Sequence, residues 1–284
     1  MIAGQPSATA ERAAIRRASH QLLDDPKVFD DPIALTLVGR PIERDLRHNP
    51  RGFETPWSRP LRAFLAARSR YAEDALDLAV RRGTRQYVVL GAGLDSFAYR
   101  NPYETIGLRV VEVDCVATQA WKVQRLREVG IRIPDSVTFA SHDFEGGALG
   151  ETLARAGVDP TKPSFFAWLG VTPYLTPQSV VATLDSLSRI RVTGTEIVFD
   201  YCSPPSSLRR VARRAFDGLA RRLRERGEPW IGFFDPASLE RTILEMGFTR
   251  IETLGPGDIH ARYFDGRKDG LTVGLLGHLA HVHA

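Results

Sequence analysis

The sequence predicts an α/β protein with a doubly wound, mostly parallel sheet of seven strands. Three observations support this fold class. Short apolar runs alternate with helical segments along most of the chain, which is typical of β-α-β units. The first of these runs, 87–90, ends at Gly91-Ala92-Gly93, as a buried parallel strand that leads into a tight turn would. The last two predicted strands come late in the chain, and we expect them to form an antiparallel edge.

The composition is that of an ordinary globular protein. The chain has 284 residues, of which 43% are hydrophobic and 25% charged, and its net charge is +4. So mild a charge does not by itself indicate nucleic-acid binding. No run approaches the ~20 apolar residues of a membrane span, and none forms the core of a signal peptide. We therefore expect a reduced, cytoplasmic enzyme, without nucleic-acid or membrane partners.

We expect a single domain over 1–284, and its first 82 residues are predicted to form a helical cap and a lid. Apolar periodicity predicts helices over 10–23 and 61–82. Asp30-Asp31-Pro32 predicts the start of a short helix between them. The stretch 40–60 contains four prolines and is expected to be a loop with short helical turns. Such long irregular stretches often close over a binding site.

Residues 83–284 are predicted to form the sheet and its covering helices. Further strands are expected at 108–114, 137–143, 164–170, 195–201, 248–254 and 271–281, and helices at 118–128, 147–156, 208–226, from Thr176-Pro177 and from Asp235-Pro236. Residues 204–234 are expected to form a helical insertion. Its amphipathic helix carries eight arginines opposite its apolar face, which we interpret as a solvated face, with an anionic-substrate site as the alternative.

The glycine turn lies where open α/β sheets bind nucleotides. Asp114 ends the second strand a little over ~20 residues later, where an acid can hydrogen-bond both ribose hydroxyls of an adenosine. The third glycine of the dinucleotide fingerprint is absent, since Ser96 stands there. Asp95 beside the turn suits a cationic ligand better than a pyrophosphate, because like charges repel. S-adenosylmethionine fits these demands; a helix N-cap is the alternative role for Asp95.

Two further residues follow the third strand. Asp143 is placed to accept a hydrogen bond from an adenine amino group, and Phe144 to contact the adenine ring. A capping or turn role is the alternative for Asp143. The two cysteines, Cys115 and Cys202, have neither metal nor redox spacing, and no metal site is expected.

Together with other motifs, these residues resemble the leucine carboxyl methyltransferase-like family of S-adenosylmethionine-dependent methyltransferases, especially its bacterial members. The resemblance is carried by Phe29-Asp-Asp-Pro32, Ala67-Arg-Ser-Arg-Tyr-Ala-Glu-Asp74, Val88-Val-Leu-Gly-Ala-Gly-Leu-Asp95, Tyr99-Arg100, Val111-Glu-Val-Asp114, Gly170-Val-Thr-Pro-Tyr-Leu-Thr176 and Ala261-Arg-Tyr-Phe264. It covers almost the whole chain. The resemblance implies a class I methyltransferase (Rossmann-like) fold with S-adenosylmethionine as the methyl donor.

The resemblance also implies roles for single residues. Arg68 would pair with the donor's carboxylate, a task that suits the two-pronged guanidinium, whereas the sequence alone suggests a surface arginine. Gly91 would approach the methionyl part and Asp114 the ribose, while Asp143 and Phe144 would contact the adenine.

The chain departs from the family at two positions. Leu169 replaces the glutamate that the family often places before the glycine after the fourth strand, close to the donor's amino group. Either backbone carbonyls take over that contact, or the donor binds more weakly. Phe97 replaces an arginine that often follows the glycine motif.

Tyr174, His260 and Arg262 are the candidates for handling the methyl acceptor. His260 is the candidate general base for a hydroxyl acceptor, with a surface histidine as the alternative. Arg262 would orient an acceptor carboxylate, or pair with Asp258 or Asp265. The sequence thus predicts an O-methyltransferase that acts on a carboxyl or hydroxyl of a small metabolite. The alternatives are an NAD(P)-dependent oxidoreductase and a non-catalytic S-adenosylmethionine-binding protein; the acceptor and the oligomeric state stay open.

Overall fold

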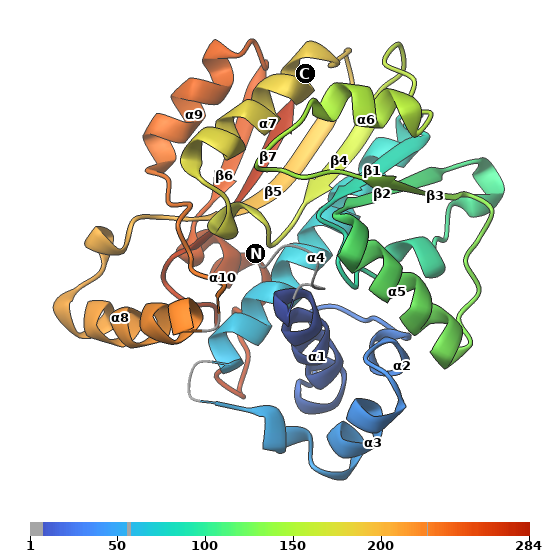
Figure 1. The fold of residues 1–284 in the computed structure, drawn as a ribbon. Coiled ribbons are helices and arrows are strands. Elements are labelled where there is room, and N and C mark those ends of the chain that lie inside the picture. The colour runs from blue at the N-terminus through green and yellow to red at the C-terminus, as the bar shows by residue number, and fades with distance from the viewer. Residues whose placement is uncertain (1–7, 56–57, 226) are drawn as a thin grey trace.

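The strands join into one sheet whose order reverses near its middle. The computed structural model describes residues 8–55, 58–225 and 227–284, and within them the sheet has seven strands in the order β3-β2-β1-β4-β5-β7-β6 (Figure 1). The strands are β1 (Gln86–Leu90), β2 (Arg109–Asp114), β3 (Val137–Ser141), β4 (Ser164–Trp168), β5 (Glu196–Cys202), β6 (Arg250–Leu254) and β7 (Gly277–His283). β1 to β5 run parallel, and β7 is antiparallel to both neighbours. The predicted fold class is confirmed.

Helices cover both faces because each buried strand presents alternate residues to opposite sides. Tyr87 and Val89 of β1 pack in one cluster with α4 (Ser58–Arg81) and α10 (Pro256–Tyr263). Val88 and Leu90 pack in a second cluster on the other face. The helices of that second cluster are α6 (Leu149–Arg155), α7 (Pro177–Arg189) and α9 (Pro236–Glu245). α7 begins at the predicted N-cap Thr176, whose side chain accepts a hydrogen bond from the Ser179 N–H.

The N-terminal helices pack against α5 in a third, smaller core. They are α1 (Ala8–Leu23), α2 (Ala34–Leu37), α3 (Arg40–His48) and the 3-10 helix η1 (Pro50–Phe53). Leu37 and Leu46 are fully buried there with Leu126 of α5 (Val116–Val129). Figure 1 shows these helices in blue below the sheet, and α1 contacts α4 while α2 contacts α5.

Several residues of the motifs that carry the family resemblance form hydrogen bonds and ion pairs between these helices and the residues after β1. Asp31 accepts hydrogen bonds from Ser96 at 2.6 Å, and its carboxylate lies 2.9 Å from the Arg17 guanidinium. Arg100 donates to Glu73 of α4 and lies 3.5 Å from Asp31. Because a buried charge is tolerated only when it is paired, these motif residues hold the helices in place beside the glycine turn.

The structure corrects three expectations. Residues 40–48 form α3, a longer helix than the short helical turns expected within the loop 40–60: the proline in its first turn costs no hydrogen bond there, and Leu46 anchors the helix in the core. α10 was not expected; it starts after Gly255, whose N–H donates to Asp258. Residues 271–276 precede β7 as irregular chain without being part of it, and Leu271 and Val273 pack in the same cluster as α4.

The segment between β5 and α9 holds the 3-10 helix η5 (Pro205–Ser207) and α8 (Arg210–Glu225). α8 projects from the rest of the fold in Figure 1, and none of its described side chains is buried. The described arginines of α8 are exposed to solvent, which agrees with the interpretation of this helix face as a solvated one. Among the described residues, no helix is both long and apolar enough to cross a membrane.

Asp24 links α1 to α4, and its carboxyl group should make the free energy of unfolding depend on pH. It accepts hydrogen bonds from Arg62 at 2.8 and 3.0 Å and from His20 at 2.7 Å. Burial raises the pKa of Asp24, but these bonds outweigh it and lower the pKa from 3.8 to about 2. A depressed carboxyl pKa contributes stability above the unfolded value, and that stability disappears as the pH falls from about 4 towards 2.

We expect the free energy of unfolding to fall by roughly 2 kcal/mol more in the wild type than in Asp24→Asn between pH 5 and pH 2. Urea unfolding at a series of pH values measures this difference. Parallel pH profiles of the two proteins would contradict the role of Asp24.

Candidate active site

A buried ion pair lies at the carboxyl end of the sheet, where its strand order reverses between β1 and β4. Arg68 of α4 donates to Asp200 of β5 at 2.9 Å, and the Gly170 N–H donates to the other oxygen of the same carboxylate. The side chains are 13% and 3% exposed, so neither charge is fully solvated. Gly170 has φ +76°, and a Cβ there would lie 2.5 Å from the Arg68 guanidinium. Only glycine lets that guanidinium lie against the backbone.

The glycine turn folds back onto the end of β2. Gly91 and Gly93 have φ of +68° and +44°, which side chains strongly disfavour. The Gly91 and Ala92 N–H groups donate to the Val113 carbonyl at 2.7 and 3.0 Å. A Cβ on Gly91 would lie only 2.2 Å from the Val171 side chain, which follows β4. The turn is therefore packed tightly between the end of β2 and the loop that follows β4.

Asp114 is joined to the turn. Its two carboxylate oxygens accept hydrogen bonds from the N–H groups of Gly93 and Cys115, each at 2.7 Å. Burial raises the pKa of Asp114, although these two bonds oppose the rise. The structure thus brings together the glycine turn and the acid that the sequence assigned to the ribose.

The other residues predicted to contact S-adenosylmethionine interact with residues of the protein itself in this structure. Asp95 accepts from the Phe97 N–H at 2.9 Å and Asp143 from the Glu145 N–H at 3.0 Å, so each closes a turn. Phe144 stacks on Trp168 at the end of β4, with ring centroids 5.9 Å apart. Leu169 is half-buried and packs in the cluster that contains α4, whereas Phe144 packs in the cluster on the other face of the sheet.

The three acceptor candidates do not lie together. Tyr174 ends the 3-10 helix η4 (Thr172–Tyr174), packs edge-on against Trp230, and has its pKa raised by burial. His260 and Arg262 are exposed on α10. His260 bonds Thr272 at 2.8 Å, while Arg262 lies over the Tyr71 ring.

Arg262 pairs with neither of the acids expected for it. Its nearest carboxylate is that of Glu252 on β6, 4.0 Å away. In the part of the chain that the structure describes, neither His260 nor Arg262 has a hydrogen bond or ion pair to Arg68, Asp200 or the glycine turn.

Sequence reasoning did not single out Asp200. One signal for it is present: it is an acid near the end of an otherwise apolar strand, every residue of which is buried. A charge in such a position needs a partner, and the polar edge of the sheet is where partners are found. Its partner Arg68 comes from a helix 132 residues earlier.

Helix α1 lies over the glycine turn. Ala10 is so close that a Cβ on Gly93 would lie 3.0 Å from its side chain. The Thr9 N–H donates to Glu228 at 2.9 Å, which joins the start of α1 to the segment before α9. On its other side, α1 borders a hollow of about 110 Å³ that Arg12, Ser58 and Arg62 help to line. The hollow lies beside the N-terminal half of α4, the helix that carries Arg68.

Known proteins resemble the chain in both sequence and fold. The family model described as "Leucine carboxyl methyltransferase" matches residues 10–188. The "Putative S-adenosyl-L-methionine-dependent methyltransferase YktD" of Bacillus subtilis (strain 168) is 29% identical over 303 positions, which cover 99% of each chain. The "Putative S-adenosyl-L-methionine-dependent methyltransferase FRAAL3718" of Frankia alni is 32% identical over 199 residues, 67% of this chain and 66% of that protein.

Two crystal structures share the fold at low sequence identity. A "putative methyltransferase" from Thermobifida fusca YX has a TM-score of 0.59 and 17% identity, over 99% of this chain and 96% of that one. A DUF574 family protein from Streptomyces avermitilis has a TM-score of 0.56 and 16% identity, over 95% of this chain and 96% of that one. These likenesses concern the arrangement of helices and strands alone.

Proposed function

Because the chain belongs to the leucine carboxyl methyltransferase family, it is an S-adenosyl-L-methionine-dependent methyltransferase, and we propose that it methylates a carboxyl or hydroxyl oxygen of a small metabolite. When bound, S-adenosylmethionine supplies the methyl group from a sulfonium. The observation that carries our assignment of the site is the cluster of Arg68, Asp200 and the Gly170 N–H at the switch point of the sheet.

The cluster fits the amino-acid end of the donor. That end carries one carboxylate and one ammonium, and the cluster offers a guanidinium and a carboxylate. We assign Arg68 to the donor's carboxylate and Asp200 to its ammonium. When the donor binds, each residue would give up its contact with the other and pair with the donor instead. In this assignment Asp200 supplies the negative charge that Leu169 cannot, so the family's usual glutamate is not needed.

The adenosine end is assigned to the neighbouring strand ends. Asp114 would hold the ribose hydroxyls, and Phe144 offers its ring to the adenine. Asp95 remains the closest acid to the glycine turn in sequence and is proposed to contribute negative potential towards the sulfonium. The turn contributes close backbone approach, because neither glycine has a side chain.

For the acceptor, we favour a carboxylate over a hydroxyl. A carboxylate needs no general base, and the residue assigned as base, His260, lies on α10 and bonds Thr272. Methyl transfer is an in-line displacement, so these residues act mainly by positioning the reactants and excluding water.

The experiment combines donor binding with product chemistry. Thermal shift should show stabilisation by S-adenosylmethionine and S-adenosylhomocysteine and none by NAD. Transfer of a labelled methyl group should then be measured across matched small carboxylic acids and alcohols. We expect base-labile label, which a methyl ester gives and a methyl ether does not. Label that survives mild base would instead assign a hydroxyl acceptor, and transfer only to protein would contradict a small metabolite.

A further inference from the structure

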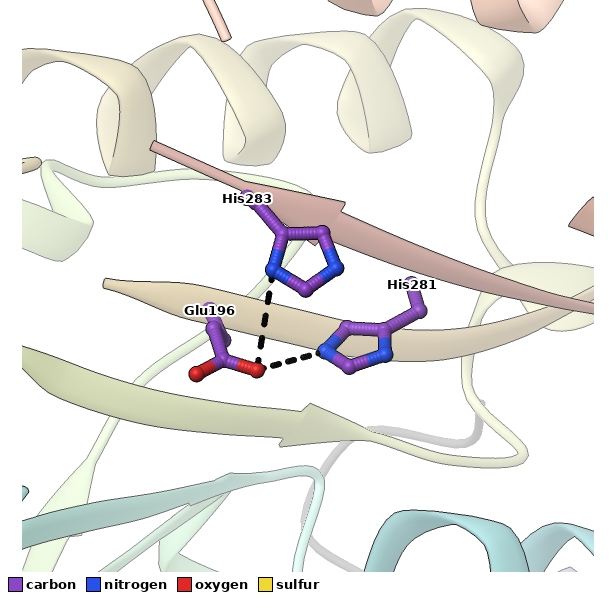
Figure 2. A group of neighbouring side chains, drawn as sticks. All are labelled: Glu196, His281 and His283. Carbon is purple, nitrogen blue, oxygen red and sulfur yellow. Dashed lines mark hydrogen bonds and ion pairs between the residues drawn. The ribbon is translucent and has the colours of Figure 1, made fainter. Parts of the chain in front are cut away.

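Three ionisable side chains meet at the opposite end of the sheet from the donor-binding cluster. Glu196 is the first residue of β5, and His281 and His283 lie on β7, which is paired with it. The histidines are two residues apart on one strand and therefore share a face. Figure 2 shows both imidazoles turned towards the Glu196 carboxylate. The contacts are 2.8 Å for His281 Nε2 and 3.7 Å for His283 Nδ1, both to the same oxygen.

Their donor atoms suit a zinc-like ion. Two imidazole nitrogens and a carboxylate oxygen are typical ligands for zinc, and the three atoms lie within 4.8 Å of one another. Bonds of about 2.0–2.1 Å in a tetrahedral site separate ligand atoms by roughly 3.3 Å. Small side-chain rotations would therefore bring the three atoms around one ion. Glu196 and His281 are buried, whereas the His283 side chain is 17% exposed and leaves access from one side.

The surroundings supply outer hydrogen bonds. The second nitrogen of His281 lies 3.3 Å from the Tyr71 hydroxyl, the kind of partner that orients a metal-binding imidazole.

In this structure two arginines donate hydrogen bonds to Glu196 and His283. Arg82 donates to the other Glu196 oxygen, and Arg250 donates to His283 Nε2 at 2.8 Å. Arginine has no acceptor atom, so His283 accepts there and its proton lies on Nδ1, the atom that faces Glu196. Both arginines are exposed and are free to turn towards water. Metal binding would then release Arg250 and move the His283 proton to Nε2.

We propose that Glu196, His281 and His283 bind one divalent transition-metal ion of the zinc class, with water as the fourth ligand. The ion would pin the last strand of the chain to β5. It is separate from methyl transfer, because Glu196 precedes Asp200 by four residues, or about 13 Å of extended strand.

The test uses the full-length chain without a polyhistidine tag. After removal of metal by chelation, Co²⁺ is titrated and its visible absorption recorded, and Zn²⁺ is measured by competition. We expect one ion per chain, a visible spectrum typical of nitrogen and oxygen ligands, and a rise in Tm with Zn²⁺. His281→Ala and Glu196→Gln should weaken binding by more than the roughly 100-fold that an outer-shell substitution costs.

Two further variants make the test specific. His278→Ala changes a histidine of the same strand outside the cluster and should bind the ion as the wild type does. Arg250→Gln should bind about 10-fold more tightly, because it removes a positive charge that competes with the ion. Binding of S-adenosylhomocysteine shows that each variant is folded. A wild type that binds no ion, or equal binding by wild type and His281→Ala, would overturn the proposal.

Discussion

Replacing Arg68 by alanine is expected to weaken binding of S-adenosylhomocysteine at least about 30-fold. Removing one partner of a buried, hydrogen-bonded charge pair costs roughly 2–5 kcal/mol, and about 1.4 kcal/mol corresponds to a factor of ten. The substitution removes the guanidinium that we assign to the ligand's carboxylate, which would otherwise pair with it in a largely buried site. Titration calorimetry measures the affinity. The affinity of Arg68→Lys should lie between those of the wild type and Arg68→Ala, because lysine keeps the positive charge but cannot make bidentate hydrogen bonds.

Arg70→Ala is the matched control. Arg70 lies on the same helix, half exposed, and its ion pair is with Asp74 one turn later. Such surface pairs contribute little, so affinity should be unchanged. The double variant Arg68→Ala/Asp200→Ala separates folding from binding: it should recover stability, since no charge is left unpaired, and should still bind poorly. Wild-type affinity in Arg68→Ala would refute the assigned donor site.

Lys122→Ala is expected to lower the free energy of unfolding by about 3–5 kcal/mol. Lys122 of α5 and Glu112 in the middle of β2 form a pair of 2.7 Å, with side chains 2% and 0% exposed. Burial raises the pKa of Glu112, and Lys122 opposes that rise. Without the ammonium, the bond from the Tyr99 hydroxyl at 3.1 Å is the one that remains to the carboxylate among the residues that the structure describes. Urea unfolding measures the loss.

A surface pair of the same type is the control for Lys122. Lys27 and Asp30 also lie 2.7 Å apart but are 41% and 70% exposed, so Lys27→Ala should change stability by less than about 1 kcal/mol. Replacing both partners of the buried pair, as Lys122→Met/Glu112→Leu, should recover most of the stability. Equal losses in Lys122→Ala and Lys27→Ala would show that burial does not govern the pair.

The sheet was predictable because its signals are local. Each strand is a short apolar run, and the turn after β1 needs glycines whose φ values lie in the left-handed region. Two departures of the structure from the predicted elements have the same cause. Residues 40–48 are helical, and 271–276 are not a strand, because packing against α1 and α4 outweighs the local pattern.

The sequence by itself determined the fold class, the glycine turn and the acid of β2, because apolar period and backbone conformation act over neighbouring residues. Only the tertiary structure decided which distant charges meet. Arg68 and Asp200 are 132 residues apart, and Glu196 and His281 are 85 residues apart. Each pair forms because β5 lies beside β7 and under α4, an order set by how the whole chain buries its apolar faces.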